Sequence, residues 1–216
     1  MFFIEGIEMN IELVTYTPNP EITIANAART CYDSPAKDLE SSQKMIRALV
    51  KSGHEAMIEH ASATFKLSNV SRVLTHELCR HRLLSFAMRS QRYVKETEPS
   101  YVTPDVLVDD NTANQKLLLA KDVFDKAMQN AWDAYSLLLS YGLKPEDARF
   151  VLPNACTTEI VVSGNFREWR NVLKLRLSPR AQWEIRKAAN IICDKLYEIA
   201  PSCFEDLKNG TSIQRT

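Results

Sequence analysis

The sequence has no excess of charge of either sign. Over 216 residues, 27 lysines and arginines balance 27 aspartates and glutamates. The whole-chain field therefore offers no long-range attraction to nucleic acid or to an anionic membrane. We expect neither as a partner, and any anion-binding site must be built locally from clustered basic residues.

Long apolar runs are also missing. No window reaches the roughly 20 consecutive apolar residues that a membrane-spanning helix needs. The opening segment, residues 1–8, lacks the basic start and the long apolar core of a signal peptide. These two absences favour a cytoplasmic protein.

The five cysteines form no CxxC pair, and their number is odd. This spacing argues against a disulfide framework and against a cysteine-based zinc site, so we expect buried or inert thiols. His54 and His60 flank two glutamates, but they lie six residues apart, whereas the paired histidines of metalloprotease helices are four apart. We therefore expect no bound metal.

Hydrophobic residues make up 45% of the chain and charged residues 25%, which is typical of an ordinary globular protein. Strand-like segments at 11–17, 63–67 and 159–163 alternate with helical patterns, and no repeat or linker separates them. We expect an α+β fold, a single mixed domain over 1–216 with an antiparallel sheet flanked by long helices. The predicted helices cover approximately 20–31, 41–52, 71–80, 112–141, 166–177 and 180–200, with a short helical turn at 145–149 and Pro201 ending the last helix.

Basic residues concentrate in residues 80–93, which hold four arginines, two serines and a histidine. The commonest alternative for such a run is a solvated surface of ion pairs. Apolar residues such as Leu83, Leu84 and Phe86 interleave with the charges here, so part of the segment must lie beside buried surface. Arginine binds phosphates and carboxylates through two parallel hydrogen bonds, and the pattern predicts a site for a phosphorylated small molecule.

Arg80-His81-Arg82, followed after seven residues by Ser90, resembles the signature of the flavin-dependent thymidylate synthases. The resemblance continues in order along nearly the whole chain. It includes the segments ARTCY (28–32), GHEAMIEH (53–60), ARFVLP (148–153), NFR (165–167) and AQWE (181–184), with Asn171 and Arg176 between the last two.

The resemblance implies a site for the cofactor FAD. The matching cofactor residues are His54, Ala56, Arg80, His81, Arg82, Met88, Asn165, Phe166, Arg167 and Asn171.

It also implies that the substrate is dUMP and the product dTMP. In the family's reaction, 5,10-methylenetetrahydrofolate donates the carbon, and NADPH is the reductant. Arg176 would be the catalytic residue, since a guanidinium stays charged and can stabilise negative charge on the uracil ring. The family assembles as homotetramers. The matching substrate residues are Glu77, Arg80, Arg89, Ser90, Gln91, Arg92, Arg149 and Arg176.

Four positions depart from the family pattern: Ala56, Glu77, Ala87 and Met88. Glu77 precedes Arg80 by one helical turn, so its carboxylate could pair with that arginine or repel a nucleotide phosphate. These departures leave open a flavin-binding relative with a different substrate.

Two other classes of protein compete with an enzyme. A nucleic-acid-binding module would use the arginine cluster on phosphates, but it should have a wider basic surface and stacking aromatic residues. A structural interaction protein needs only the helices. It gives no reason for Ser90, Arg149 and Arg176 to accompany the RHR motif.

Overall fold

The computed structural model describes residues 8–31, 33–35, 37–97, 100–108 and 115–210. The chain forms two compact units, and each is described by itself below. The first unit contains the described residues of 1–10, 68–76 and 88–160, and the second unit those of 11–67, 77–87 and 161–216. The single domain over 1–216 stays a prediction.

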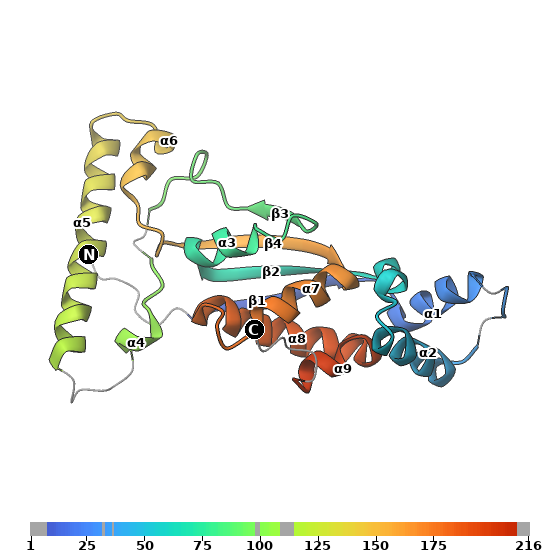
Figure 1. Cartoon of the computed structure of the whole chain (residues 1–216). Coiled ribbons are helices and arrows are strands. Elements are labelled where there is room, and N and C mark those ends of the chain that lie inside the picture. The colour runs from blue at the N-terminus through green and yellow to red at the C-terminus, as the bar shows by residue number, and fades with distance from the viewer. Residues whose placement is uncertain (1–7, 32, 36, 98–99, 109–114, 211–216) are drawn as a thin grey trace. The chain divides into compact units, whose positions relative to one another are not determined.

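Four strands form one sheet in the order β1-β2-β4-β3 (Figure 1). They are β1 (Asn10–Tyr16), β2 (Ser62–Ser71), β4 (Thr157–Asn165) and β3 (Ser85–Met88). Neighbouring strands are antiparallel: the backbone nitrogen of Thr17 just after β1 donates to the carbonyl of Ser62 at the start of β2 (3.0 Å). The α+β class and the antiparallel sheet are therefore confirmed.

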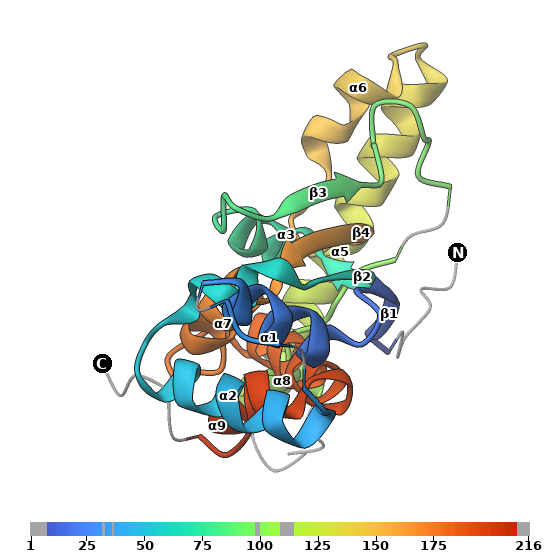
Figure 2. The same ribbon diagram turned by 90° about the vertical axis from the view of Figure 1, so that its right-hand side faces the viewer.

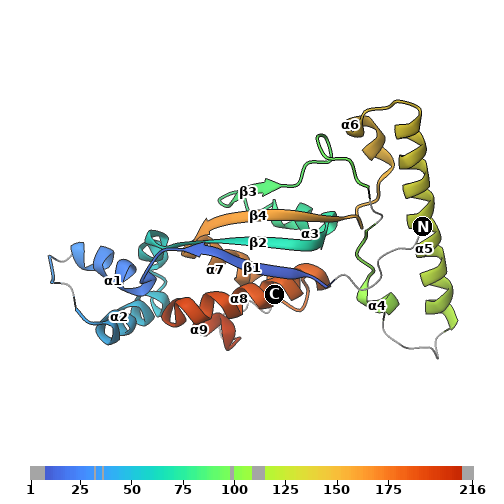
Figure 3. The ribbon, with the colours of Figure 1, turned by 180° about the vertical axis from the view of Figure 1, so that it is seen from behind.

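Helices of the second unit cover one face of its part of the sheet, where Figures 1 and 3 show α7 and α8 running alongside the strands. The indole nitrogen of Trp169 on α7 donates to the carbonyl of Ala63 on β2 (3.0 Å), and its ring packs edge-on against Phe65. Because alternate residues of β2 point to this face, Ala63, Phe65 and Leu67 are buried. The helices here are α1 (Pro20–Thr30), α2 (Leu39–Lys51), η1 (Glu55–His60), α7 (Phe166–Arg176), α8 (Trp183–Ile199) and α9 (Pro201–Lys208).

Figure 2 shows α2 beside α9 in the same unit. Arg47 of α2 pairs there with Glu205 of α9 at 2.9 Å. This contact joins the first and last sequence segments of the second unit, 11–67 and 161–216.

In the first unit, α5 (Gln115–Ser140) packs against α6 (Pro145–Ala148) and η2 (Arg149–Val151), and α4 (Asp105–Val108) contacts α5. Trp132 and Tyr135 of α5 form a buried cluster with Ala148 and Cys156. The long helix predicted over 112–141 is confirmed from residue 115 onward, and residues 112–114 lie outside the described part of the chain.

One predicted helix ends earlier than expected. The helix predicted to carry Arg80, α3 (Arg72–Leu78), ends two residues before it, because the backbone nitrogens of Arg80 and His81 bond three residues back, as in a tight turn. The helix predicted to end at Pro201 does so, since α8 ends at Ile199, but a further helix, α9, was missed; it begins at Pro201, where a missing N–H is harmless. Of the thiols expected to be buried or inert, Cys156, Cys193 and Cys203 are buried and Cys31 and Cys79 are exposed, and all five cysteines are free.

In the described ranges, no helix combines the length and apolar character needed to cross a membrane. The same ranges contain no group of three histidine, cysteine or acidic side chains that could hold a metal ion.

Candidate functional site

The turn that follows α3 presents the RHR motif to a hollow in the second unit. Arg80 and Arg82 are exposed, whereas His81 between them is buried. The backbone nitrogen of Leu84 donates to the carbonyl of His81 (3.1 Å), which keeps the turn tight. Alternate side chains therefore point outward and inward.

Two adjoining cavities of about 610 and 590 Å³ share four wall residues, so we treat them as one cleft, called here the second-unit cleft. One cavity is bordered by the RHR turn and the C-terminal half of α7, and the other by η1 and the N-terminal half of α7. The shared residues are Leu83, Glu168, Asn171 and Lys174.

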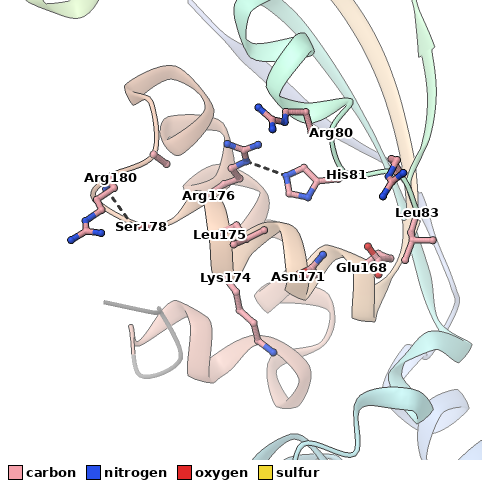
Figure 4. A pocket seen from close by; sticks show the side chains of 12 residues that line it. Arg80, His81, Leu83, Glu168, Asn171, Lys174, Leu175, Arg176, Ser178 and Arg180 are labelled. Carbon is pink, nitrogen blue, oxygen red and sulfur yellow. Dashed lines mark hydrogen bonds between the residues drawn. The ribbon is translucent and has the colours of Figure 1, made fainter. Parts of the chain in front are cut away.

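Arg176, at the end of α7, is held by three hydrogen bonds. Its Nε donates to Nε2 of His81 (3.0 Å), Nη1 to the carboxylate of Glu77 (2.6 Å), and Nη2 to the Glu77 carbonyl (2.9 Å). Figure 4 shows Arg176 facing His81 in the cleft, with the bond between them dashed. A guanidinium has five N–H groups, so three bonds fix its plane and leave two N–H groups for a ligand.

Glu77 thus pairs with Arg176 and not through its side chain with Arg80, the partner suggested by helical spacing. Nη1 of Arg176 lies 2.6 Å from the Glu77 carboxylate, and both side chains are only partly exposed. It fixes the catalytic candidate against the end of α3, and it also partly neutralises the charge of that candidate.

His81 is a neutral acceptor in this arrangement. The Nε–H of arginine can only donate, so Nε2 of His81 must carry the lone pair and Nδ1 the proton. Burial, reinforced by the charge of Arg176, lowers the pKa of His81 from 6.5 to about 4. The histidine therefore stays neutral at physiological pH.

The other end of the cleft is built on a buried ion network. Arg170 of α7 is 1% exposed and bonds both carboxylate oxygens of Asp206 (2.7 and 2.8 Å) and one of Glu55 (3.1 Å). Lys174 donates to the same Glu55 oxygen (2.7 Å). Burial would raise the pKa of Glu55, but the bonds and charges of Lys174 and Arg170 outweigh burial and lower it. Glu55 consequently stays ionised and holds Lys174 at the wall.

Three guanidiniums of the cleft, those of Arg80, Arg82 and Arg180, have no carboxylate partner among the described residues. Arg176 and Lys174 are paired with acids, and Arg167 pairs with Glu59 across the second cavity. The unpaired charges make the cleft attractive to an anion.

Six of the predicted cofactor residues line this cleft: Arg80, His81, Arg82, Asn165, Arg167 and Asn171. The other four lie elsewhere. His54 and Ala56 are exposed at η1, Phe166 is 0% exposed in the core against Phe204, and Met88 belongs to the first unit. The roles of all ten remain predictions.

Asn165 also has a structural task. Its side-chain oxygen accepts from the backbone nitrogen of Glu168 (2.9 Å) and caps α7, the helix that carries Arg167, Asn171 and Arg176.

The predicted substrate residues divide between the two units. Glu77, Arg80 and Arg176 belong to the second unit, as described above. The first unit contains Arg89, Ser90, Gln91, Arg92 and Arg149.

Within the first unit, Glu146 joins Arg92 to Arg149. The carboxylate of Glu146 accepts from Arg92 (2.6 Å), and its backbone carbonyl accepts from Nε of Arg149 (3.1 Å). Ser90 accepts from the backbone nitrogen of Arg92 (3.2 Å), which shapes the loop between them.

The sequence analysis missed Lys174, Glu55 and Arg180 in the cleft. Lys174 could have been found, because Arg167, Asn171 and Lys174 recur at the i, i+4, i+7 spacing of one helical face. Glu55 gave no such signal, since its role depends on contacts with a helix more than a hundred residues away.

Comparison with known proteins identifies the family. A family profile described as thymidylate synthase complementing protein matches residues 12–202. The flavin-dependent thymidylate synthase of Clostridium tetani is 39% identical, over 91% of this chain and 86% of its own. That of Geobacter sulfurreducens is 40% identical, over 94% and 88%.

A solved structure shows the same fold. PolB, a UMP/dUMP methylase from Streptomyces cacaoi crystallised with 5-Br dUMP, superposes with a TM-score of 0.81 at 23% identity, covering 97% of this chain and 98% of PolB. The order of the signature residues, the cleft that they line and the extent of these matches lead to one conclusion: the chain belongs to the thymidylate synthase complementing protein family, that of the flavin-dependent thymidylate synthases.

Proposed function

We propose that this protein catalyses the reductive methylation of dUMP to dTMP, with FAD as cofactor, 5,10-methylenetetrahydrofolate as carbon donor and NADPH as reductant. One observation carries the proposal: Arg176 is fixed by Glu77 and a neutral His81 in the wall of a cleft where three further arginines, Arg80, Arg82 and Arg180, have no acidic partner among the described residues. Its family relatives are named for this activity.

The second-unit cleft suits FAD. The unpaired guanidiniums of Arg80, Arg82 and Arg180 could bind the two negative charges of a dinucleotide's pyrophosphate, and the side-chain amides of Asn165 and Asn171 could hydrogen-bond its polar edges. Leu83 and Leu175 add apolar surface for a flat ring system. Bound FAD would supply the hydride that completes the methyl group.

Arg176 would act on the uracil ring. Its guanidinium stays protonated at any working pH, so it can stabilise the negative charge that develops on the ring as the new carbon bond forms. Because its plane is already fixed by three hydrogen bonds, little reorganisation is needed when the reaction begins.

Nucleophilic attack on the ring by a cysteine is not part of the proposal. Burial raises the pKa of Cys156 to about 12 and that of Cys193 to about 11, so neither forms a thiolate at neutral pH. Neither the RHR turn nor α7 carries a cysteine in the lining of the second-unit cleft.

The site residues of the first unit would hold the nucleotide phosphate. Arg89, Arg92 and Arg149 provide charge, and Ser90 and Gln91 provide hydrogen bonds. The carboxylate of Glu146 accepts from Arg92 and its carbonyl from Arg149, so an anionic substrate would compete with this carboxylate for Arg92.

We further propose that the protein is a cytoplasmic homotetramer that binds neither nucleic acid nor membranes and folds as one domain. Support for self-association comes from α5, which buries Met128, Trp132 and Tyr135 but exposes apolar residues such as Leu119 and Val123. Light scattering after size exclusion tests this directly, because a monomer has a mass of 24.6 kDa. A monomeric mass at micromolar concentration would reject the assembly.

The activity is tested by anaerobic incubation of the purified protein with FAD, dUMP, methylenetetrahydrofolate and NADPH, with each component omitted in turn. We expect dTMP on chromatography only in the complete mixture. If flavin binds and NADPH is consumed but no dTMP forms, dUMP is not the substrate of this protein. If flavin does not bind, the proposed function is rejected.

A further inference from the structure

Arg72 lies where the first unit's loop of predicted phosphate ligands meets the sheet. It is the first residue of α3, directly after β2, and its backbone nitrogen donates to the carbonyl of Cys156 (3.2 Å). The preceding Ser71 caps the helix by accepting from the nitrogen of Leu74 (3.1 Å). The position of Arg72 is therefore fixed on both sides by backbone bonds.

The Arg72 side chain reaches the predicted phosphate loop. Its Nη2 donates to the carbonyl of Arg89, the residue before Ser90 (3.3 Å). The nitrogen of Arg89 donates in turn to the carbonyl of Glu159 (3.0 Å). Arg72 and Glu159 thus hold the same peptide segment from two directions, and they fix where the loop begins.

Two donors at this place are buried without partners among the described residues. They are Nε of Arg72 and Nε2 of Gln91, and the Gln91 residue is only 6% exposed. A buried donor without a partner costs free energy, so proteins retain such groups mainly where a ligand or an ordered water completes them. A bound anion with several acceptor oxygens could accept hydrogen bonds from both the guanidinium and the amide donor.

Charges of both signs surround Arg72. Burial is the largest cause of its lowered pKa; the carboxylate of Glu96 raises this pKa, and the guanidiniums of Arg149 and Arg89 lower it further. Glu96 is itself paired with Arg89 at 3.2 Å. Cys156, the remaining neighbour, is neutral because its pKa is raised.

The basic groups here outnumber the acidic ones. In the described part of the first unit, four guanidiniums, those of Arg72, Arg89, Arg92 and Arg149, lie beside two carboxylates, of which Glu96 pairs with Arg89 and Glu146 with Arg92. The difference of these groups is two positive charges. A phosphate monoester carries about −1.5 to −2 at pH 7, which matches this excess.

We propose that Arg72 is a positioning residue of the phosphate site. Its guanidinium holds the Arg89–Arg92 loop through the Arg89 carbonyl and adds positive charge beside this loop. This inference rests on the proposed function, since it takes dUMP as the occupant. Arg72 was not among the residues implied by the family signature, and nothing in the spacing of the basic cluster points to it, because it lies eight residues before the RHR motif.

Two substitutions separate charge from hydrogen bonding. Arg72→Lys and Arg72→Gln both keep a donor for the Arg89 carbonyl, but only lysine keeps the charge. The experiment measures the dissociation constants of dUMP and deoxyuridine for FAD-loaded protein by calorimetry, at about pH 7.5 and about pH 5.5. Arg47→Gln, which removes an exposed charge of the second unit, is the control for net charge.

We expect Arg72→Gln to weaken dUMP binding about tenfold or more at the higher pH and less at the lower pH, where the phosphate has lost part of its second charge. Arg72→Lys should stay within about threefold of wild type, and deoxyuridine binding should not change. A purely structural role would not depend on the ionisation of the ligand.

Equal dUMP affinity of the glutamine and lysine variants would overturn the role of Arg72, as would equal losses for dUMP and deoxyuridine. Failure of the wild-type protein to bind dUMP at all is a different result. It would reject the proposed function, and the assignment of Arg72 with it.

Discussion

At the scale of single residues, the arrangement of Arg176 depends on hydrogen bonds more than on packing. Three of its N–H groups are engaged by two residues of the α3 end and the RHR turn, and one of the acceptors is the neutral imidazole of His81. A protonated His81 could not accept this bond, and it would place a second positive charge beside the guanidinium. The geometry therefore requires a depressed histidine pKa.

This requirement predicts a pH dependence of stability. His81 has a pKa of about 4 in the folded protein and about 6.5 when unfolded. Between these values the unfolded chain binds more protons, so the free energy of unfolding falls as pH decreases from 6.5 to 4. The loss from this residue is at most about 3.5 kcal/mol, at roughly 1.4 kcal/mol per pKa unit.

Urea denaturation between about pH 7 and pH 4.5 measures the effect. In His81→Asn, whose side-chain oxygen can still accept a bond, the stability should fall less steeply with decreasing pH than in wild type. The matched control is His76→Asn, because His76 is exposed on α3. Identical slopes for wild type and His81→Asn would contradict the buried, neutral histidine.

At the scale of elements, α7 is the main carrier of site residues, and its N-terminus is fixed by Asn165. Removal of this cap in Asn165→Ala should reduce the free energy of unfolding by about 1 kcal/mol. Asn165→Asp keeps the acceptor and places a negative charge at the helix start, so its stability should remain near wild type. Equal stability of the alanine and aspartate variants, measured in urea, would remove the capping role.

The contact between β4 and the RHR turn gives a second prediction. A Cβ built on Gly164 would lie 2.2 Å from Cδ2 of Leu84, which is buried. Gly164→Ala should therefore cost about 1–3 kcal/mol by overpacking. In the double variant with Leu84→Ala this clash disappears, so the combined loss should be smaller than the sum of the single losses. Additive losses in denaturation experiments would show that Leu84 moves aside without cost.

Sequence patterns predicted the elements that have their own periodicity or caps. The long helix α5, α2 and the three strands β1, β2 and β4 were all found, because amphipathic spacing and flanking turn residues are local signals. Strand β3 was missed: its four residues, Ser85–Met88, do not alternate in character and become a strand only by pairing with β4. The early end of α3 was missed for a similar reason, since the turn depends on the burial of His81.

For the candidate site, the family signature predicted the arginines but not the residues that hold their side chains in position. The engagement of Arg176 by Glu77, the fixing of Lys174 by Glu55 and the position of Arg72 all join segments distant in sequence. Such pairings have no periodic signal along the chain. They became visible only when the fold brought the end of α3, η1 and α7 of the second unit, or the start of α3 and the loop after β3 of the first, into contact.

At the scale of the molecule, the second unit is held together by the buried network of Arg170. This side chain joins α7 to η1 through Glu55 and to α9 through Asp206 and the carbonyl of Cys203. Arg170→Met would leave two partly buried carboxylates without their cation, so we expect a loss of about 3–5 kcal/mol. Because Glu55 would then lose part of what keeps it ionised, Lys174 should also be less well held.

The control is Arg47→Met, which breaks an exposed ion pair to Glu205 on the same helix α9. Its cost should be below about 1 kcal/mol. Thermal and urea denaturation of both variants test the contrast. Similar losses for the two arginines would mean that burial of the Arg170 network does not strengthen it.

The most direct test of the role of Arg176 measures dTMP formation by Arg176→Ala that has been shown by absorbance to retain FAD, beside wild type and the control Arg47→Ala on α2, which lies outside the cleft lining. We expect Arg47→Ala to be as active as wild type, and Arg176→Ala to bind flavin but form almost no dTMP. Wild-type rates of dTMP formation by Arg176→Ala would contradict the central claim that this guanidinium, fixed by Glu77 and His81, stabilises the reacting uracil.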